Sequence, residues 1–303
     1  MPPSINYDSP AELSCFLKYH GLGMRKKFGQ NFLINPLLRS RLLDALEIGE
    51  GEKIWEIGPG LGAMTRGLLE RGCRLTAFEI DPAFSKLLKE FFPHESFRLI
   101  EGDVFKTWPI ASAELDGNSP YRELFLFGNL PYNIAAALLA DFIEKKRFFK
   151  RMVVTVQHEV ALRMTAAPGS ANYSSFTVLC SSLYRVKKLM IIKNSNFYPV
   201  PGVDSQGVRL DLLPGPVNLP ALFNPLVRSV FSSRRKTLKN TLTNFASSVI
   251  LKREGVSSLT AAETAAEVFK RTGISGDIRA ETLETAGFAA LADALEAIVG
   301  NEG

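Results

Sequence analysis

Four consecutive residues, Asn129-Leu130-Pro131-Tyr132, place an amide, a rigid turn and an aromatic ring directly after an apolar stretch. The side-chain oxygen of Asn129 and the main-chain oxygen of Leu130 can accept hydrogen bonds from an exocyclic aromatic amine such as that of adenine. Two such acceptors pull the nitrogen toward tetrahedral geometry and free a lone pair that is otherwise delocalised into the ring. Pro131 stiffens the turn and lacks a competing N–H, and Tyr132 offers a ring on which a base can stack. The segment therefore predicts a site that makes an aromatic amine nucleophilic.

An amine activated in this way can attack a sulfonium-bound methyl group without a general base, because the leaving group drives the step. Most of the rate then comes from positioning. A base inside a nucleic-acid helix is out of reach, so its nucleotide must be flipped out or already unpaired. We expect Phe197, in a segment held extended by Pro199 and Pro201, to cover the second face of the base.

A glycine-rich turn, Gly58-Pro59-Gly60-Leu61-Gly62, follows a strand-like segment and opens a helix. Gly58 and Gly60 allow a sharp turn and a close approach of the backbone to a ligand. Dinucleotides and S-adenosylmethionine both use such a turn, and Ala63 can serve as the third small residue of a dinucleotide motif. The turn alone does not exclude NAD.

Two acidic residues follow the next two strand-like segments. Glu79 ends the second segment and can accept hydrogen bonds from both ribose hydroxyls, and Ile80 directly after it belongs to the same expected site. Asp103 follows the third segment and can accept from an adenine amino group, while the N–H of Val104 reaches a ring nitrogen. A turn cap is the alternative role for Asp103. In this order, the glycine turn and the two acids favour an adenosine-containing cofactor.

The elements that must carry these residues alternate between strand and helix, which predicts an α/β fold with a largely parallel sheet and helices on both faces. Strands are expected at 53–57, 74–79, 97–100, 124–127, 152–156, 186–192 and 208–212, and helices near 36, 62–71, 82 and 134–146. A linker at 214–220 then precedes helical patterns at 221–231, 237–249, 261–271 and 283–299. We therefore expect a ligand-binding domain at 1–213, with an N-terminal extension at 1–24, and a small helical domain at 214–303.

Composition narrows the class of protein. The chain has 303 residues, of which 46% are hydrophobic, but no apolar run approaches the roughly 18 residues that a membrane helix needs. The N-terminus does not resemble a secretory signal. The three cysteines are far apart, and neither they nor the three histidines have metal-ligand spacing. We expect a cytoplasmic protein with reduced thiols and without a metal or membrane.

Basic residues are clustered, although the formal net charge is only +5. One cluster is Arg25-Lys26-Lys27, a second lies at 145–151, and a third lies in the stretch between Asp211 and Glu254, which holds no acidic residue. Three such clusters favour a polyanionic partner. If this partner is a nucleic acid, we expect its phosphates to be contacted by Arg234, Arg235, Lys236 and Lys239. Arg235 and Lys239, four residues apart, are expected to share a helix face.

Taken together, these motifs resemble those of the KsgA/RsmA-type small-subunit ribosomal RNA adenine N6,N6-dimethyltransferases. The resemblance covers about residues 9–295. It rests on these segments: 27–33 (KFGQNFL), 56–60 (EIGPG), Glu79, Gly102-Asp103, 129–134 (NLPYNI), 197–201 (FYPVP), 203–205 (VDS), 234–237 (RRKT) and 279–283 (RAETL).

The resemblance implies a Rossmann-like S-adenosylmethionine-dependent methyltransferase sheet and a helical C-terminal RNA-binding domain. It places Gln30, Asn31 and Leu33 over the methionine end of the cofactor, and has Asn129 touch both cofactor and target. Gly58 and Gly60 would line the cofactor, with Glu79 on the ribose and Asp103 and Val104 on the adenine. The implied substrate is a pair of adjacent adenosines in a hairpin loop near the 3′ end of 16S rRNA. The implied partner is an immature small ribosomal subunit, and we expect the enzyme to be a monomer.

Three alternatives remain open at this point: a large-subunit rRNA adenine methyltransferase, a non-enzymatic ribosome-assembly factor on the same fold, and an NAD-dependent dehydrogenase. The chain also departs from the family pattern at Ala135-Ala136-Ala137, where the family has a hydroxyl residue and then a proline, and at Gly207, where it has an apolar residue. These departures concern the shape of the pocket and the efficiency of the second methylation.

Overall fold

The computed structural model describes residues 5–24, 29–116, 123–215, 219–251 and 259–300. Two compact units make up the chain: Met1–Ala161 with Arg185–Leu212, and Leu162–Tyr184 with Leu213–Gly303. The second unit thus holds the helical tail and also a segment from within the expected first domain. Some residues singled out above lie outside the described ranges: Arg25, Lys26, Lys27, Phe28 and the middle of the expected linker, 216–218.

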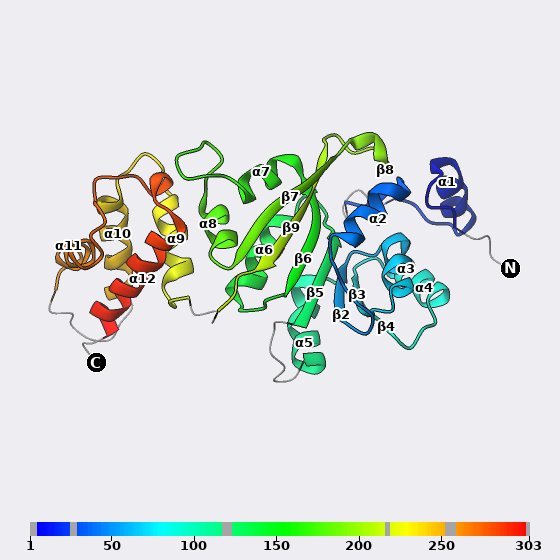
Figure 1. The fold of residues 1–303 in the computed structure, drawn as a ribbon, viewed down its shortest axis with the longest axis horizontal. Helices are drawn as coiled ribbons and strands as arrows, with labels where there is room; N and C mark the ends of the chain where they lie inside the picture. Colours follow the sequence, from blue (N-terminus) through cyan, green and yellow to red (C-terminus); the bar gives the residue numbers. More distant parts are fainter. Residues whose placement is uncertain (1–4, 25–28, 117–122, 216–218, 252–258, 301–303) are drawn as a thin grey trace. The chain divides into compact units, whose positions relative to one another are not determined.

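A seven-stranded sheet dominates the first unit (Figure 1), with the order β4-β3-β2-β5-β6-β9-β7. Its strands are β2 (Lys53–Ile57), β3 (Arg74–Glu79), β4 (Phe97–Glu101), β5 (Leu124–Asn129), β6 (Arg151–Gln157), β7 (Tyr184–Ile192) and β9 (Ser205–Leu212). The neighbouring strands from β4 to β6 are parallel, and β9 runs antiparallel to β6. This arrangement confirms the expected Rossmann-like sheet.

The topology gathers the ends of distant segments at one edge of the sheet. The chain runs outward from β2 to β4 and then returns to place β5 on the other side of β2. At such a switch point, ligands bind beyond the carboxyl ends of the strands. The glycine turn after β2, Glu79 at the end of β3 and Asn129 at the end of β5 all lie at this edge.

Several helices of the first unit begin at a residue whose side chain caps them. They are α1 (Pro10–Tyr19), α2 (Pro36–Asp44), α3 (Ala63–Glu70), α4 (Pro82–Phe91), α5 (Val104–Asp116), α6 (Ala135–Glu144) and α7 (His158–Met164). Asn35 and Asp81 accept backbone N–H groups in the first turns of α2 and α4, and a proline follows each cap. A short antiparallel pair, β1 (Phe32–Leu33) with β8 (Phe197–Tyr198), lies outside the main sheet, and a 3-10 turn (Asn194–Asn196) precedes β8.

Alternation along the strands divides the core between the two faces of the sheet. On one face, Ile54, Phe127 and Val153 pack with Leu42 of α2 and Leu68 of α3. On the other face, the ring of Trp55 lies 4.8 Å from Phe78 and 5.6 Å from Phe149. The first face also carries the side chains that line the cavity described below.

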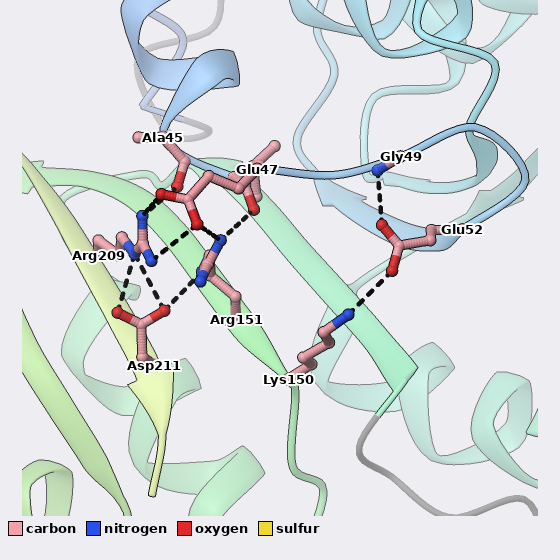
Figure 2. Close-up of polar contacts among 9 residues, drawn as sticks. Ala45, Glu47, Gly49, Glu52, Lys150, Arg151, Arg209 and Asp211 are labelled. Carbon is pink, nitrogen blue, oxygen red and sulfur yellow. Dashed lines mark hydrogen bonds and ion pairs between the residues drawn. The ribbon is translucent and has the colours of Figure 1, made fainter.

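A network of ion pairs fastens the turn after α2 to two strands (Figure 2). Arg209 of β9 and Arg151 of β6 donate to opposite oxygens of Glu47, at 2.6 and 2.7 Å, and both pair with Asp211. Hydrogen bonds from Arg209 and Arg151 lower the pKa of Glu47 to about 2. The network thereby fixes the end of α2, whose Leu42 and Arg39 border the cavity.

Unit two is helical around its own core. Its helices are α8 (Ser175–Ser181), α9 (Phe223–Phe231), α10 (Leu238–Ile250), α11 (Ala261–Thr272) and α12 (Thr285–Gly300), with a 3-10 turn at Ala280–Thr282. Leu226, Leu242 and Leu291 are fully buried together. The four helices expected in the tail are confirmed to within two residues at their ends. Within the described ranges, no helix is both long and apolar enough to span a membrane.

Candidate active site

A cavity lies at the carboxyl edge of the sheet, where the expected cofactor residues meet. It is lined by Gly29, Gln30, Asn31, Phe32, Leu33, Arg39, Leu42, Glu56, Gly58, Pro59, Gly60, Ala63, Met64, Glu79, Ile80, Phe84, Phe127, Asn129, Pro131 and Thr155. Most of the predicted cofactor residues are therefore brought together. Asp103 and Val104 are not among them.

The glycine turn adopts a backbone that favours glycine. Gly58 and Gly60 have φ angles of 69° and 59°, in the left-handed region. A Cβ atom on Gly60 would lie 2.8 Å from the ring of Phe32, so a larger residue would close the cavity on that side. The N-terminal segment supports the turn, because the hydroxyl of Tyr7 donates to the Leu61 carbonyl at 2.9 Å.

Glu79 is held by the backbone on both of its oxygens. Oε2 accepts the Gly60 N–H at 3.0 Å and Oε1 accepts the Asp81 N–H at 2.9 Å. The side chain is only 4% exposed, and burial raises its pKa. The backbone N–H of Ile80 also hydrogen-bonds the carboxyl, and the acceptor position that is left can serve a ribose hydroxyl. Ile80, 42% exposed, presents an apolar surface beside it.

A second buried carboxyl, Glu56, lies under the cavity. Its Oε2 accepts the Thr65 hydroxyl at 2.7 Å. Burial, reinforced by the nearby charge of Glu79, raises the pKa of Glu56 to about 8. Glu56 was not among the site residues predicted individually from the sequence, although a charged residue between Trp55 and Ile57 in an apolar strand is a usable signal.

The segment before β1 closes one side of the cavity. Gln30 Nε2 donates to Asp81 Oδ2 at 3.0 Å, and Asn31 Nδ2 donates to the Gly29 carbonyl at 3.1 Å. Leu33 is buried at 6% exposure. All three residues line the cavity, as expected for groups that cover one end of a ligand.

Asn129 has its amide orientation fixed by the same segment. Its Nδ2 donates to the Asn31 carbonyl at 2.8 Å, and because a carbonyl can only accept, the contacting atom must be the nitrogen. Among the described residues, no donor reaches Asn129 Oδ1 or the Leu130 carbonyl. Neither oxygen proposed to accept from the amine is thus used by a described donor; Asn129 lines the cavity, whereas Leu130 is 1% exposed and is not among the lining residues.

The two aromatic residues expected to sandwich a base occupy different environments. Tyr132 is half-buried and its hydroxyl lies 2.6 Å from Ser205 Oγ. Phe197 is 1% exposed, because its pairing with Leu33 turns the ring into the core beside Ile192. The expectation that Phe197 presents a ring face to the base is therefore corrected.

Asp103 caps a helix in this structure. Its Oδ1 accepts the Phe105 N–H at 3.0 Å in the first turn of α5, and Val104 is 6% exposed. Helix α5 was not predicted from the sequence. Gly102, with a positive φ, precedes Asp103 at the N-terminus of this helix. The turn-cap alternative therefore describes Asp103 as it stands, and the adenine contact is not supported by the cavity.

Several lining residues went unrecognised in the sequence. Phe32 and Phe84 form an apolar wall with ring centroids 5.9 Å apart. Thr155, the hydroxyl residue of the otherwise apolar run Met152–Val156, lies on the strand beside Asn129. A lone hydroxyl in such a run is the signal that could have identified it.

The lining chemistry suits an adenosine ligand without phosphates. The basic residue of this lining is Arg39, which is engaged by the Leu33 carbonyl at 2.8 Å and by Asp8. The unused oxygens and the buried Glu79 carboxyl fit ribose and ammonium groups better than a pyrophosphate. Over the described residues, no group of three or more His, Cys, Asp or Glu could hold a metal ion.

Three of the expected RNA-binding residues, Arg234, Arg235 and Lys236, lie in the turn between α9 and α10, and Lys239 lies in the first turn of α10. Helix α10 begins at Leu238 with Thr237 as its cap, so Arg235 precedes the helix. The prediction that Arg235 and Lys239 share a helix face is therefore wrong. Arg234 already has hydrogen-bond partners within its own unit: it donates to Glu281 at 2.8 Å and to the Ala171 carbonyl at 2.9 Å. Arg235, Lys236 and Lys239 are exposed.

The strand order, the glycine turn and the acid after β3 define a Rossmann-like protein of the methyltransferase class. Residues 21–270 match the model of the family described as ribosomal RNA adenine dimethylase. The chain belongs to that family.

Relatives and solved structures agree with this assignment. "Ribosomal RNA small subunit methyltransferase A" of Treponema denticola is 44% identical over 302 residues, which cover 96% of each chain. The protein of the same name from Treponema pallidum is 41% identical, over 97% of this chain and 99% of its own. A dimethyladenosine transferase from Plasmodium falciparum superposes with a TM-score of 0.68 at 25% identity, over 85% of this chain and 94% of its own. The 23S rRNA methyltransferase ErmE, 20% identical with a TM-score of 0.60, shares the fold, over 87% of this chain and 99% of its own.

Proposed function

We propose that this chain transfers methyl groups from S-adenosylmethionine to the N6 amines of two adjacent adenosines in a 3′-terminal hairpin loop of 16S rRNA. The observation that carries the proposal is the pair of unused acceptors, Asn129 Oδ1 and the Leu130 carbonyl, at the end of β5. The names of the relatives support the small-subunit substrate. We further propose that the enzyme acts as a cytoplasmic monomer on an immature small subunit.

The residues divide the work between holding the cofactor and activating the amine. We assign binding of the cofactor to seven residues that line the cavity: Gln30, Asn31, Leu33, Gly58, Gly60, Glu79 and Ile80. When bound, it supplies an electrophilic methyl group. Asn129 Oδ1 and the Leu130 carbonyl accept hydrogen bonds from the two N–H groups of the amine, which frees the nitrogen lone pair for attack. Pro131 keeps the two acceptors in a rigid turn, and Tyr132, anchored by Ser205, supplies a surface for the base.

The function is tested with unmethylated small subunits and isotope-labelled cofactor, followed by nucleoside analysis of the separated RNAs. We expect dimethyladenosine in 16S rRNA. Label in large-subunit RNA would favour the large-subunit alternative. Binding of subunits without any transfer of label would favour a non-enzymatic assembly factor.

Charge reversal in the turn between α9 and α10 and at the start of α10 tests the RNA-binding surface. With Arg235, Lys236 and Lys239 all replaced by Glu, we expect weaker subunit binding and a shallower dependence on salt. If each contacts one phosphate, the slope of log K against log[salt] should fall by about 2–3 in magnitude, measured by filter binding at several salt concentrations. Arg234 is left unchanged because its loss would also break the contact with Glu281.

A matched control changes the same charge elsewhere. Lys86, Lys106 and Lys270 are exposed and can be replaced by Glu together. If the control lowers the salt slope as much as the first variant, binding follows net charge, and the proposed surface is wrong.

A further inference from the structure

Thr155 carries a buried hydroxyl for which the described protein supplies no partner. The residue is 0% exposed and its Oγ1 makes no hydrogen bond within the described part of the chain. It also lines the candidate cofactor cavity. A buried hydroxyl without a partner is energetically unfavourable, so the group calls for an explanation outside the protein's own contacts.

The neighbours of Thr155 explain why it stays unpaired. In the sheet it lies directly between Asn129 of β5 and Gly207 of β9, in register with both. The amide nitrogen of Asn129 already donates to the Asn31 carbonyl, and Gly207 has no side chain. A Cβ atom on Gly207 would lie 2.9 Å from Leu42 Cδ2, so the glycine keeps this row open toward α2.

The position of Thr155 along the sheet edge indicates which part of a ligand it meets. Glu79, assigned to the ribose, ends β3, and the glycine turn follows β2. Asn129 ends β5 and Thr155 lies on β6, so Thr155 is three strands from Glu79 in the order β3-β2-β5-β6. The cavity wall nearest this side comes from Asn31 and from Leu42 of α2.

We propose that Thr155 Oγ1 hydrogen-bonds the amino-acid end of the cofactor, at its α-amino or α-carboxylate group. The inference rests on the proposed function, since it takes the adenosine end to lie at Glu79. A hydroxyl both donates and accepts, so it can serve either charged group. Thr155 would then be a binding residue that the family motifs do not contain, placed where Gly207 leaves room for it.

The test compares Thr155→Val, which removes the hydroxyl and keeps the shape, with Thr155→Ser, which keeps the hydroxyl. Two probes are used: S-adenosylhomocysteine, and 5′-methylthioadenosine, which lacks the amino-acid end. We expect Thr155→Val to weaken the binding of S-adenosylhomocysteine about 10-fold, measured by calorimetry, because the variant loses one hydrogen bond to a charged group. Binding of methylthioadenosine should be unchanged, and Thr155→Ser should restore most of the S-adenosylhomocysteine affinity.

A second readout uses the ligand-free protein. Because the hydroxyl has no protein partner, the Tm of Thr155→Val without ligand should equal or exceed that of the wild type. A lower Tm would show that the hydroxyl is already satisfied, and would overturn the proposal. Equal losses for the two probes, or no loss for either, would also overturn it.

Other outcomes separate this proposal from the proposed function. If Thr155→Val left S-adenosylhomocysteine binding intact and raised only the KM for small subunits, the hydroxyl would meet the target base, and the proposal would be wrong. Wild-type protein that binds S-adenosylhomocysteine but forms no dimethyladenosine would contradict the proposed function and leave the Thr155 assignment standing. Wild-type protein that binds neither probe would overturn both.

Discussion

Replacing Asn129 with alanine is expected to lower kcat for methyl transfer by roughly 10²–10³-fold, the usual cost of removing one positioned polar group that acts in the transition state. The loss follows because Oδ1 is one of the two acceptors that free the lone pair of the amine. Cofactor affinity should fall by no more than about 10-fold, since the variant loses one neutral hydrogen bond, to the Asn31 carbonyl. Single-turnover assays and calorimetry measure the two effects separately.

Companion variants sharpen this result. Asn129→Asp keeps an oxygen acceptor but replaces the donor with a charged oxygen facing the Asn31 carbonyl, so we expect both cofactor affinity and kcat to fall. Asn172→Ala, at an exposed position, makes the same chemical change away from the cavity and should behave as wild type. A kcat for Asn129→Ala close to that of wild type would refute the acceptor role.

Replacing Glu56 with glutamine should change how stability depends on pH. Burial raises the folded-state pKa of Glu56 from its ordinary value of 4.5 to about 8. The folded state therefore binds this proton more tightly than the unfolded state. The stability that the protonated Glu56 side chain contributes is fully present below pH 4.5 and is lost as the pH rises toward 8. Glutamine does not titrate, so at pH 9 the variant should be more stable than wild type by roughly 3–5 kcal/mol.

Urea denaturation from pH 5 to pH 9 measures the difference between Glu56→Gln and wild type. Near pH 5 the two proteins should be close in stability, because the Thr65 hydroxyl can still donate to the glutamine oxygen. Glu90→Gln, on the exposed surface of α4, is the control and should follow wild type at every pH. Parallel curves for Glu56→Gln and wild type across this range would show that Glu56 is ionised throughout.

Sequence reasoning located the sheet well, since its strands are short apolar runs bounded by glycine, proline or charge. The limits expected for β2 and β3 are those found. The side-chain cap of Asn35 and the acceptor turn at Asn129 were also local features, which a single segment can reveal. Helix α5 escaped because Pro109 lies inside it and interrupts the helical pattern.

Several other errors concern contacts between distant segments. The pairing of Arg234 with Glu281 depends on a residue 47 positions later, and the burial of Phe197 depends on Leu33. The unpaired state of Thr155 likewise follows from Asn129 and Gly207, which come from different strands. Such facts appear only once the register of the sheet is known.

The network of ion pairs formed by Glu47 with Arg151 and Arg209 affects the order in which parts of the protein can form during synthesis. Glu47 and Arg209 are 162 positions apart in the chain, so the network cannot be completed until β9 has been made. A nascent chain that has left the ribosome only as far as β6 would carry every residue of the cavity lining, but not Arg209 and Asp211, which complete the ion-pair network behind α2. The support behind α2 would thus form late in translation, after the residues that line the cavity have already emerged.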